Sequence, residues 1–179
     1  MKMNFFRHLK TVTRHRRIVR KLCFKCGLIW QGLTHDLSKF SRAEFRAGVK
    51  YYQGNRSPQA KEREELGFSA AWLHHKGRNK HHAEYWTDSG GVGAMSPVKM
   101  PPRYLAEMVC DRVAASKVYK GKNYHDGCPL EYFEARKGRV VMHPETAETL
   151  EYFLTMLKDE GEEKTFKELK KFVKESKKK

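Results

Sequence analysis

Long apolar runs are missing from this chain of 179 residues, and so are the features of a cleaved signal. A helix that spans a bilayer needs roughly 20 consecutive apolar residues, and no segment approaches that length. The first eight residues, MKMNFFRH, contain no uninterrupted apolar stretch of the kind that secretory signals carry. We therefore expect a cytoplasmic protein that makes no use of a membrane.

Cysteine is scarce as well, with only Cys23, Cys26, Cys110 and Cys128 in the chain. Disulfide frameworks are typical of much smaller chains, so four cysteines do not predict one here. Cys23 and Cys26 have the spacing of half a zinc site, but no second pair with that spacing follows. Because positions three apart share a face of a helix, we interpret both as small buried hydrophobes rather than as a zinc or redox pair.

Acidic residues are missing from residues 1–25, which are rich in Lys and Arg, and residues 164–179 hold eight Lys. The formal net charge of the whole chain is +16. Such a charge attracts polyanions, which makes nucleotides and nucleic acids one class of expected partner. A solvated basic face on a soluble protein accounts for the same charge, so composition alone does not decide between these interpretations.

Helical periodicity dominates what the chain does contain. Apolar residues recur at three- and four-residue steps through residues 5–27, which predicts an amphipathic helix. Further helices are expected over 28–40, 41–52, 61–76, 81–86, 101–120, 130–137 and 144–158, and Gly67 can split the one over 61–76. A capping box marks the start at residue 41, and prolines mark the starts at residues 101 and 144. Residues 89–93 are expected to form a flexible loop, and Gly161 to separate a last basic segment. No β-rich region and no internal repeat is evident, so the prediction is an all-α fold.

The most informative segment is His-Asp-Leu-Ser-Lys at residues 35–39. His35 and Asp36 offer an imidazole nitrogen and a carboxylate, which together suit a divalent transition metal. Lys39 follows four residues after His35 and three after Asp36, so on a helix it lies on the same face. A cation beside a metal is what a phosphate oxygen needs, and the segment therefore indicates a phosphate-binding metal site.

Two histidine doublets, His74-His75 and His81-His82, flank a Gly-Arg-Asn sequence at 77–79. On an unbroken helix, equivalent histidines of the doublets would be about 10 Å apart, too far for one ion. The interruption allows the chain to turn, so both doublets can face a common centre, and large apolar residues on either side hold the segment against the core. The competing interpretation is a basic surface loop whose histidines simply titrate.

Asp111 lies among apolar residues of the helix expected over 101–120, where a carboxylate is costly unless it is paired or bound to a cation. Glu107 lies four residues earlier on the same face, and either Arg112 or a metal can supply the positive charge that the two acids need. We expect Asp111 to be the more buried of the two. On the first helix, we expect His15 to point inward and His8 to lie on the surface.

In chain order the candidate metal ligands are His15, His35, Asp36, His75, His81, His82 and Asp111. This order resembles the ligand set of the HD-domain superfamily of metal-dependent phosphohydrolases. The spacings are most similar, over about residues 5–158, to an uncharacterised bacterial and phage family of unknown function. The two later histidine groups are closer together in sequence than in better-studied binuclear members, which leaves the number of ions open.

The resemblance implies an HD-domain-like helical bundle, with residues 1–160 as the metal-binding domain and residues 161–179 as a basic amphipathic helix or tail. It also implies one or two divalent ions (Mn, Fe, Co, Ni or Mg), which Asp36 would bridge. The implied activity is hydrolysis of a phosphomonoester or phosphodiester in a phosphorylated small molecule or nucleotide. In that reaction Asp36 holds the ions, Lys39 contacts the phosphate, and Glu107 orients a ligand or accepts a proton.

Two other functions are consistent with the same residues. Some HD-domain relatives fill this ligand set with two irons and activate oxygen, which makes a di-iron oxygenase the first alternative. The basic termini also suit a non-enzymatic protein that binds nucleic acid or acts as an adaptor. No pattern in the sequence indicates the oligomeric state.

Overall fold

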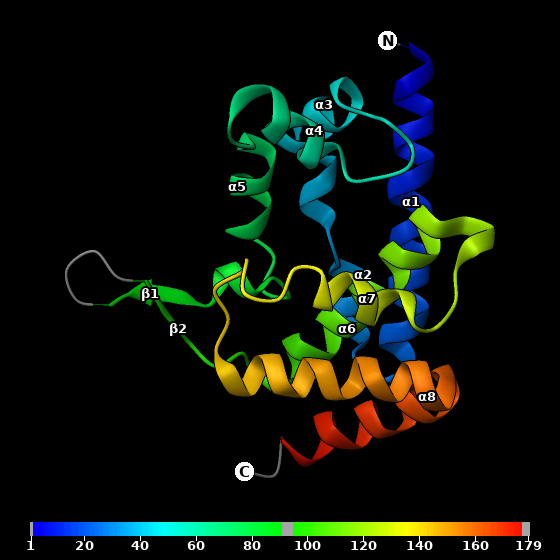
Figure 1. Cartoon of the computed structure of the whole chain (residues 1–179). Coiled ribbons are helices and arrows are strands. Elements are labelled where there is room, and N and C mark those ends of the chain that lie inside the picture. The colour runs from blue at the N-terminus through cyan, green and yellow to red at the C-terminus, as the bar shows by residue number, and fades with distance from the viewer. Residues whose placement is uncertain (1, 91–94, 177–179) are drawn as a thin grey trace.

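The computed structural model describes residues 2–90 and 95–176, and over these residues the fold is almost entirely helical (Figure 1), which confirms the predicted all-α class. The α-helices are α1 (Lys2–Lys25), α2 (Ile29–Thr34), α3 (Arg42–Lys50), α4 (Pro58–Leu66), α5 (Ala70–Lys76), α6 (Pro102–Lys120), α7 (Cys128–Glu134) and α8 (Pro144–Glu175). Short 3-10 helices are η1 (Leu37–Phe40), η2 (Ala83–Tyr85) and η3 (Gly121–Asn123). The strands are β1 (Thr87–Ser89) and β2 (Met95–Pro97).

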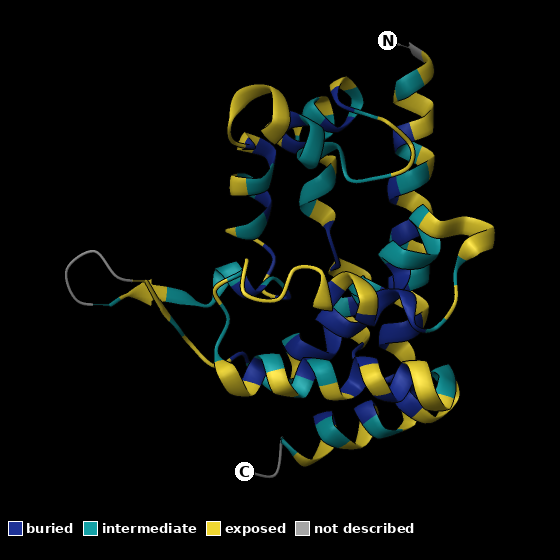
Figure 2. Ribbon diagram, in the orientation of Figure 1, coloured by how far each residue is buried: buried dark blue, intermediate teal, exposed yellow. Residues whose placement is uncertain are grey.

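Helix α6 is the central helix of the hydrophobic core. Its residues 105–110 are all buried, so the helix is covered on nearly every side, as expected for a core helix with apolar residues all round. Helix α1 packs along it through Val19, Leu22 and Cys23, and α8 contributes Leu150 and Leu154 from another side. The core therefore lies where α1, α6 and α8 meet (Figure 2).

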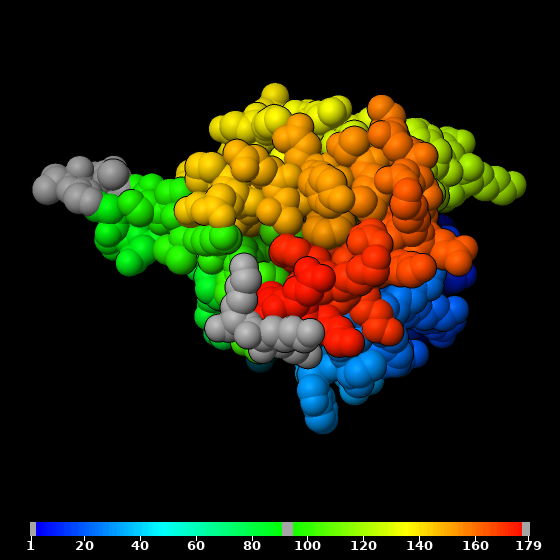
Figure 3. Space-filling model, turned by 90° about the horizontal axis from the view of Figure 1, so that it is seen from below, coloured from blue at the N-terminus to red at the C-terminus, as the bar shows by residue number. Residues whose placement is uncertain are grey.

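Helix α8 folds back on itself at Gly161, which confirms the predicted break. Gly161 has φ 76° and ψ 174°, a conformation that favours glycine because a Cβ would be strained there. The stretch after Gly161 returns along the body and buries Phe166, Leu169 and Val173 in the core cluster. Figure 3 shows it lying between the first half of α8 and the segments near the start of the chain. Its lysines lie on the opposite, exposed side.

Helices α3, α4 and α5 form a second group on the side of the molecule away from α8 (Figure 1). Helix α3 contacts both α4 and α5, and it also contacts α1. Their interior is smaller, with Tyr51 and Ala71 among the buried apolar residues. The predicted helix over 61–76 is divided into α4 and α5, because Gly67 ends α4 in a left-handed conformation with φ 78°. The space between the two groups of helices is where the candidate ligands meet.

One predicted loop contains a small amount of β-structure. Strands β1 and β2 pair antiparallel with Thr87 opposite Pro97, Asp88 opposite Ser96 and Ser89 opposite Met95. The expectation of a flexible loop from residue 89 was wrong at its start, because strands of three residues are too short to show an alternating pattern in the sequence. Residues 91–94 of that loop lie outside the described residues.

The four cysteines are free and buried, and the predicted burial of Cys23 and Cys26 is thus confirmed. Burial raises the pKa of the Cys110 thiol, and the nearby Cys23 and Cys26 raise it further, so this thiol stays protonated.

As for membrane insertion, none of the helices in the described part of the chain has both the length and the apolar character that crossing a bilayer requires.

Candidate metal centre

The His35-Asp36 pair lies in a sharp turn between two helices. Helix α2 ends before His35, and Asp36 has φ 53° and ψ 29°, in the left-handed region. It is the only residue besides glycine with a positive φ among those described. Such a conformation costs about 1–3 kcal/mol and persists where the surrounding structure imposes it, often at functional sites. The prediction of one helix over 28–40 was therefore wrong, because the chain turns so that the Asp36 carboxylate lies between the other ligands.

Three side chains, those of His15, His35 and Asp111, gather around one oxygen of Asp36. The Nε2 atom of His15 lies 3.6 Å from Asp36 Oδ2, 3.0 Å from Asp111 Oδ1 and 3.3 Å from His35 Nε2. His35 Nε2 lies 3.3 Å from Asp36 Oδ2 and 3.4 Å from Asp111 Oδ1. A tetrahedron with metal–ligand bonds of about 2.1 Å has edges of about 3.4 Å, so these separations fit one ion at the centre. We call this group the first ligand set.

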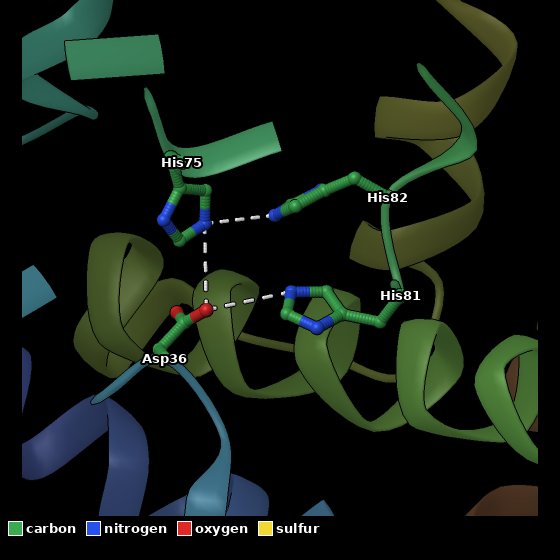
Figure 4. A group of neighbouring side chains, drawn as sticks. All are labelled: Asp36, His75, His81 and His82. Carbon is green, nitrogen blue, oxygen red and sulfur yellow. Dashed lines mark hydrogen bonds and ion pairs between the residues drawn. The ribbon is translucent and has the colours of Figure 1, made fainter. Parts of the chain in front are cut away.

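A second group converges on the other oxygen of Asp36 (Figure 4). His75 Nε2 lies 3.3 Å and His81 Nε2 3.5 Å from Asp36 Oδ1. His82 Nε2 lies 2.9 Å from His75 Nε2 and completes the group. These separations again match the edges of a coordination polyhedron. We call this group the second ligand set. Asp36 belongs to both sets through different oxygens, which is the arrangement of a carboxylate that bridges two ions.

Buried polar atoms without hydrogen-bond partners support the presence of a metal. Both oxygens of Asp36 and the Nε2 atom of His81 are buried and accept or donate no hydrogen bond. The Lys39 ammonium lies 2.6 Å from Asp36 Oδ2 as an ion pair, but its geometry is not that of a hydrogen bond. Unpartnered buried groups of this kind cost free energy, and a cation at the two sets would satisfy them. The residues therefore fit divalent ions that accept nitrogen and oxygen ligands.

The protonation states of Asp36 and His82 suit metal binding. Burial raises the pKa of Asp36, but His35, Lys39 and His75 outweigh burial and hold this pKa well below its usual value. Burial lowers the pKa of His82, and the neighbouring His81 and His75 lower it further. Asp36 is therefore an anion, and His82 a neutral imidazole whose nitrogen lone pair is available to an ion.

Glu107 orients two of the ligands from outside the two sets. Its Oε1 accepts a hydrogen bond from His35 Nδ1 at 2.8 Å and lies 3.1 Å from His81 Nδ1 in an ion pair. These contacts turn the Nε2 atoms of both rings toward Asp36, as outer-shell carboxylates do at metal sites. Of the two roles expected for Glu107, the geometry favours orientation of ligands over acceptance of a proton from a substrate.

Glu107 is also more buried than Asp111, with side-chain exposures of 7% and 17%. The expectation that Asp111 is the more buried acid was therefore wrong. Glu107 lies beneath the His35 and His81 rings, whereas Asp111 faces a cavity one turn further along α6. Both positions are in a helix with buried neighbours, and the sequence does not show which acid faces the opening.

Sequence reasoning missed Glu44, which orients a ligand of the second set. Its Oε2 accepts a hydrogen bond from His75 Nδ1 at 2.7 Å, and its Oε1 one from His74 Nδ1 at 2.7 Å. The sequence indicates a capping box for Ser41 and Glu44, and Ser41 does cap α3 by accepting from the Glu44 backbone N–H. The capping box already explains why a Glu stands at position 44. No further signal near it in the sequence indicates its contact with His75.

The turn between the histidine doublets is held by Asn79. Its side-chain nitrogen donates to Ser38 Oγ at 2.8 Å and to the His75 backbone carbonyl at 2.8 Å. These bonds tie the turn to the loop that carries Asp36. The predicted interruption thus brings His75, His81 and His82 together, whereas His74 points to Glu44 and belongs to neither ligand set.

His8 is buried rather than exposed, so its expected place on the surface was wrong. Its ring fills the space beside Gly48, where an added Cβ would come 2.1 Å from His8 Nε2. Phe45 lies against the same ring, with ring centroids 5.1 Å apart. Because Gly48 on the neighbouring helix α3 has no side chain, there is room for the His8 imidazole. The periodicity of α1 gives no sign of this contact.

A cavity of about 590 Å³ opens onto the two ligand sets. His15, His75, His82 and Asp111 lie in its wall, and Lys39 lies beside them. Burial opposes the charge of Lys39, but Asp36 and Asp111 outweigh burial and raise its pKa, so the side chain is a cation. The metal centre is therefore accessible from one side, and a positive charge stands at that opening.

The chain belongs to a family of unknown function, DUF5662. The model of this family matches residues 4–156, which include every residue of both ligand sets together with Glu44 and Glu107. No curated protein matches the chain, and no solved structure matches it either. Membership of DUF5662 therefore assigns no activity to the chain.

We predict that Glu44→Gln weakens the second ligand set and spares the first. The amide has only one acceptor oxygen, so it cannot serve both His74 and His75, and outer-shell changes of this type cost about 10–100-fold in metal affinity. Competition with a chelator should show one weakened site and one unchanged site. Two equally weakened sites would contradict the division into sets, and Glu163→Gln, an exposed acid on α8, is the control.

We also predict that metal affinity of this DUF5662 protein rises with pH. Burial lowers the pKa of His35, but Asp36, Asp111 and Glu107 outweigh burial and raise it well above its usual value. His35 is then a cation without metal at neutral pH, so an ion that binds Nε2 must displace a proton, and acid competes with the ion. Calorimetric titrations at about pH 6 and about pH 8 should show tighter binding at the higher pH and release of protons. Equal affinity at both pH values would contradict this.

Proposed function

We propose that this protein is a metal-dependent phosphohydrolase of the HD-domain type, with a centre of two ions bridged by Asp36. The observation that carries the proposal is the pair of ligand sets that share Asp36, next to Lys39, in the wall of one cavity. Two divalent ions in such a centre supply a water of lowered pKa and stabilise negative charge on a phosphoryl group.

The residues of the chain divide the remaining tasks. His15, His35 and Asp111 would hold one ion, His75, His81 and His82 the other, and Asp36 both. Lys39 is available to contact a phosphate oxygen or the leaving group, because its ammonium stands at the cavity beside Asp36. Glu107 and Glu44 hold the imidazole rings of the ligands in place, so the ions would be positioned before the substrate binds.

Metal analysis followed by an activity panel tests the proposal. The purified protein should contain about two divalent ions per chain. Phosphomonoesters, phosphodiesters and nucleotides should then be assayed with Mn, Co, Ni and Mg. Hydrolysis that EDTA removes and added metal restores is the expected result. No bound metal and no hydrolysis with any of the four would overturn the proposal.

The same preparation distinguishes the two alternative functions. Bound iron with an optical band, and oxygen uptake without release of phosphate, would identify an oxygenase. Binding of DNA or RNA that salt weakens steeply and EDTA leaves unchanged would identify a basic nucleic-acid-binding protein.

A further inference from the structure

Arg112 follows Asp111 on α6 and lines the same cavity as the metal centre. Its Nε atom is buried and has no hydrogen-bond partner. None of the ion pairs between described residues involves Arg112. A guanidinium is always charged, and a buried charge without a counter-ion is costly. Arg112 therefore stands in the cavity wall as a cation that the described protein leaves without a partner.

The surroundings of Arg112 hold the guanidinium in place without neutralising it. Its central carbon lies 5.6 Å from the centre of the Phe133 ring and 6.0 Å from that of Tyr132. Arg136 lies on the same Tyr132 ring at 5.4 Å and also lines the cavity. Stacking on aromatic rings is typical of arginines that recognise anions. The two arginines and the ring form a cationic wall, which we call the arginine wall.

The carboxylates that line this part of the cavity, Asp111 and Glu84, lie near Arg112 but form no ion pair with the arginine wall among the described residues. Asp111 belongs to the first ligand set, and Glu84 makes no ion pair with either arginine among the described residues. The cavity, at about 590 Å³, is also much larger than one phosphate group needs. An anion at the metal centre would therefore leave the arginine wall free to bind another.

We propose that the arginine wall binds a second anionic group of the substrate, a phosphate or a carboxylate, while the first phosphate lies at the metal centre. The proposal rests on the proposed function, because the first anion is placed at the two ligand sets. Arg112 is the principal contact, since its planar fork can bind two oxygens of the anion at once. Arg136, at the exposed edge, adds a second positive charge. The substrate class is accordingly a phosphate ester with a further anionic group.

Binding of non-hydrolysable phosphonates tests this proposal. The metal-loaded protein should be titrated with methylphosphonate, with phosphonocarboxylates and with bisphosphonates whose two anionic groups are separated by two to four carbons. At least one ligand with two anionic groups should bind about 10-fold more tightly than methylphosphonate, which corresponds to one additional charged contact. The better of the two series identifies the second group as carboxylate or phosphate.

Variants of the arginine wall test whether its residues cause the tighter binding of ligands with two anionic groups. Arg112→Gln should reduce the preference for two anionic groups to about 2-fold or less, and Arg112→Lys should retain part of it, because lysine keeps the charge but not the fork. Arg103→Gln, an exposed arginine on the same helix, should retain all of it. If Arg112→Gln fails to fold, as thermal melting would show, Arg136→Gln at the exposed edge must still reduce the preference.

The outcomes separate this proposal from the proposed function. If no spacer gives tighter binding, or if the preference survives in the variants of both Arg112 and Arg136, the second anion site is overturned. If methylphosphonate binding does not depend on metal, the proposed function fails instead. A phosphonate that still binds in an Arg112-dependent manner would then show an anion site without a phosphohydrolase centre.

Discussion

Asp36→Asn should empty both metal sites at once and abolish hydrolysis. Each oxygen of the carboxylate belongs to a different ligand set, so the loss of its charge affects both ions. Asparagine tolerates the left-handed conformation of this residue, and the turn should therefore remain intact. We expect metal content to fall from about two ions per chain toward none, and the rate of hydrolysis to fall by about 10³-fold or more.

Single-set variants provide the comparison for Asp36→Asn. His15→Gln removes a ligand of the first set and His82→Gln one of the second, so each should lose about one ion. Asp159→Asn, an exposed carboxylate on α8, should retain both. Mass-spectrometric metal analysis of the four purified variants, together with rates on the best substrate, measures this series. An Asp36→Asn protein with two bound ions would contradict a bridging role for the carboxylate.

Glu107→Gln should weaken both sites while leaving every metal ligand in place. The carboxylate accepts a hydrogen bond from His35, a ligand of the first set, and forms an ion pair with His81, a ligand of the second. An amide oxygen accepts less strongly than a carboxylate, so both imidazoles become less basic and less well oriented. We expect metal affinity to fall about 10–100-fold at each site, as measured by competition with a chelator.

The contrast with Glu44→Gln makes this prediction specific. Glu44 contacts a ligand of the second set only, so its variant should leave one site unchanged, whereas Glu107→Gln should leave neither unchanged. Circular dichroism with EDTA present checks that both variants fold without metal. If Glu107→Gln lowered the metal affinity of only one site, the claim that Glu107 orients ligands of both sets would be wrong.

The structure brings together every side chain that the sequence marks as a candidate metal ligand. These residues could be predicted because imidazoles and buried carboxylates are uncommon and carry a specific chemistry. His15 could be chosen over His8 from the apolar residues Val19 and Leu22 that follow it, and both of these are buried. The turn between the histidine doublets was likewise visible as a Gly-Arg-Asn interruption. The ligand set is thus encoded in residue type and local pattern.

The parts of the site that escaped prediction depend on contacts between distant segments. Glu44 already has a local role as part of a helix cap, so nothing in the sequence ties it to His75. The burial of His8 depends on Gly48, a residue on another helix. The left-handed turn at Asp36 places its carboxylate among side chains from distant segments, which no local pattern shows. Tertiary packing therefore decided each of these features.

Because the candidate ligands come from both groups of helices, a metal centre at this site would have a mechanical role as well as a chemical one. His15 and Asp111 belong to α1 and α6, whereas His75 lies on α5, and Asp36 joins the two sides. Ions held there would cross-link the smaller group of helices to the main core, as a disulfide does in other proteins. The four cysteines of this protein are all free, so bound ions would be the cross-link that holds the two groups of helices together around the cavity.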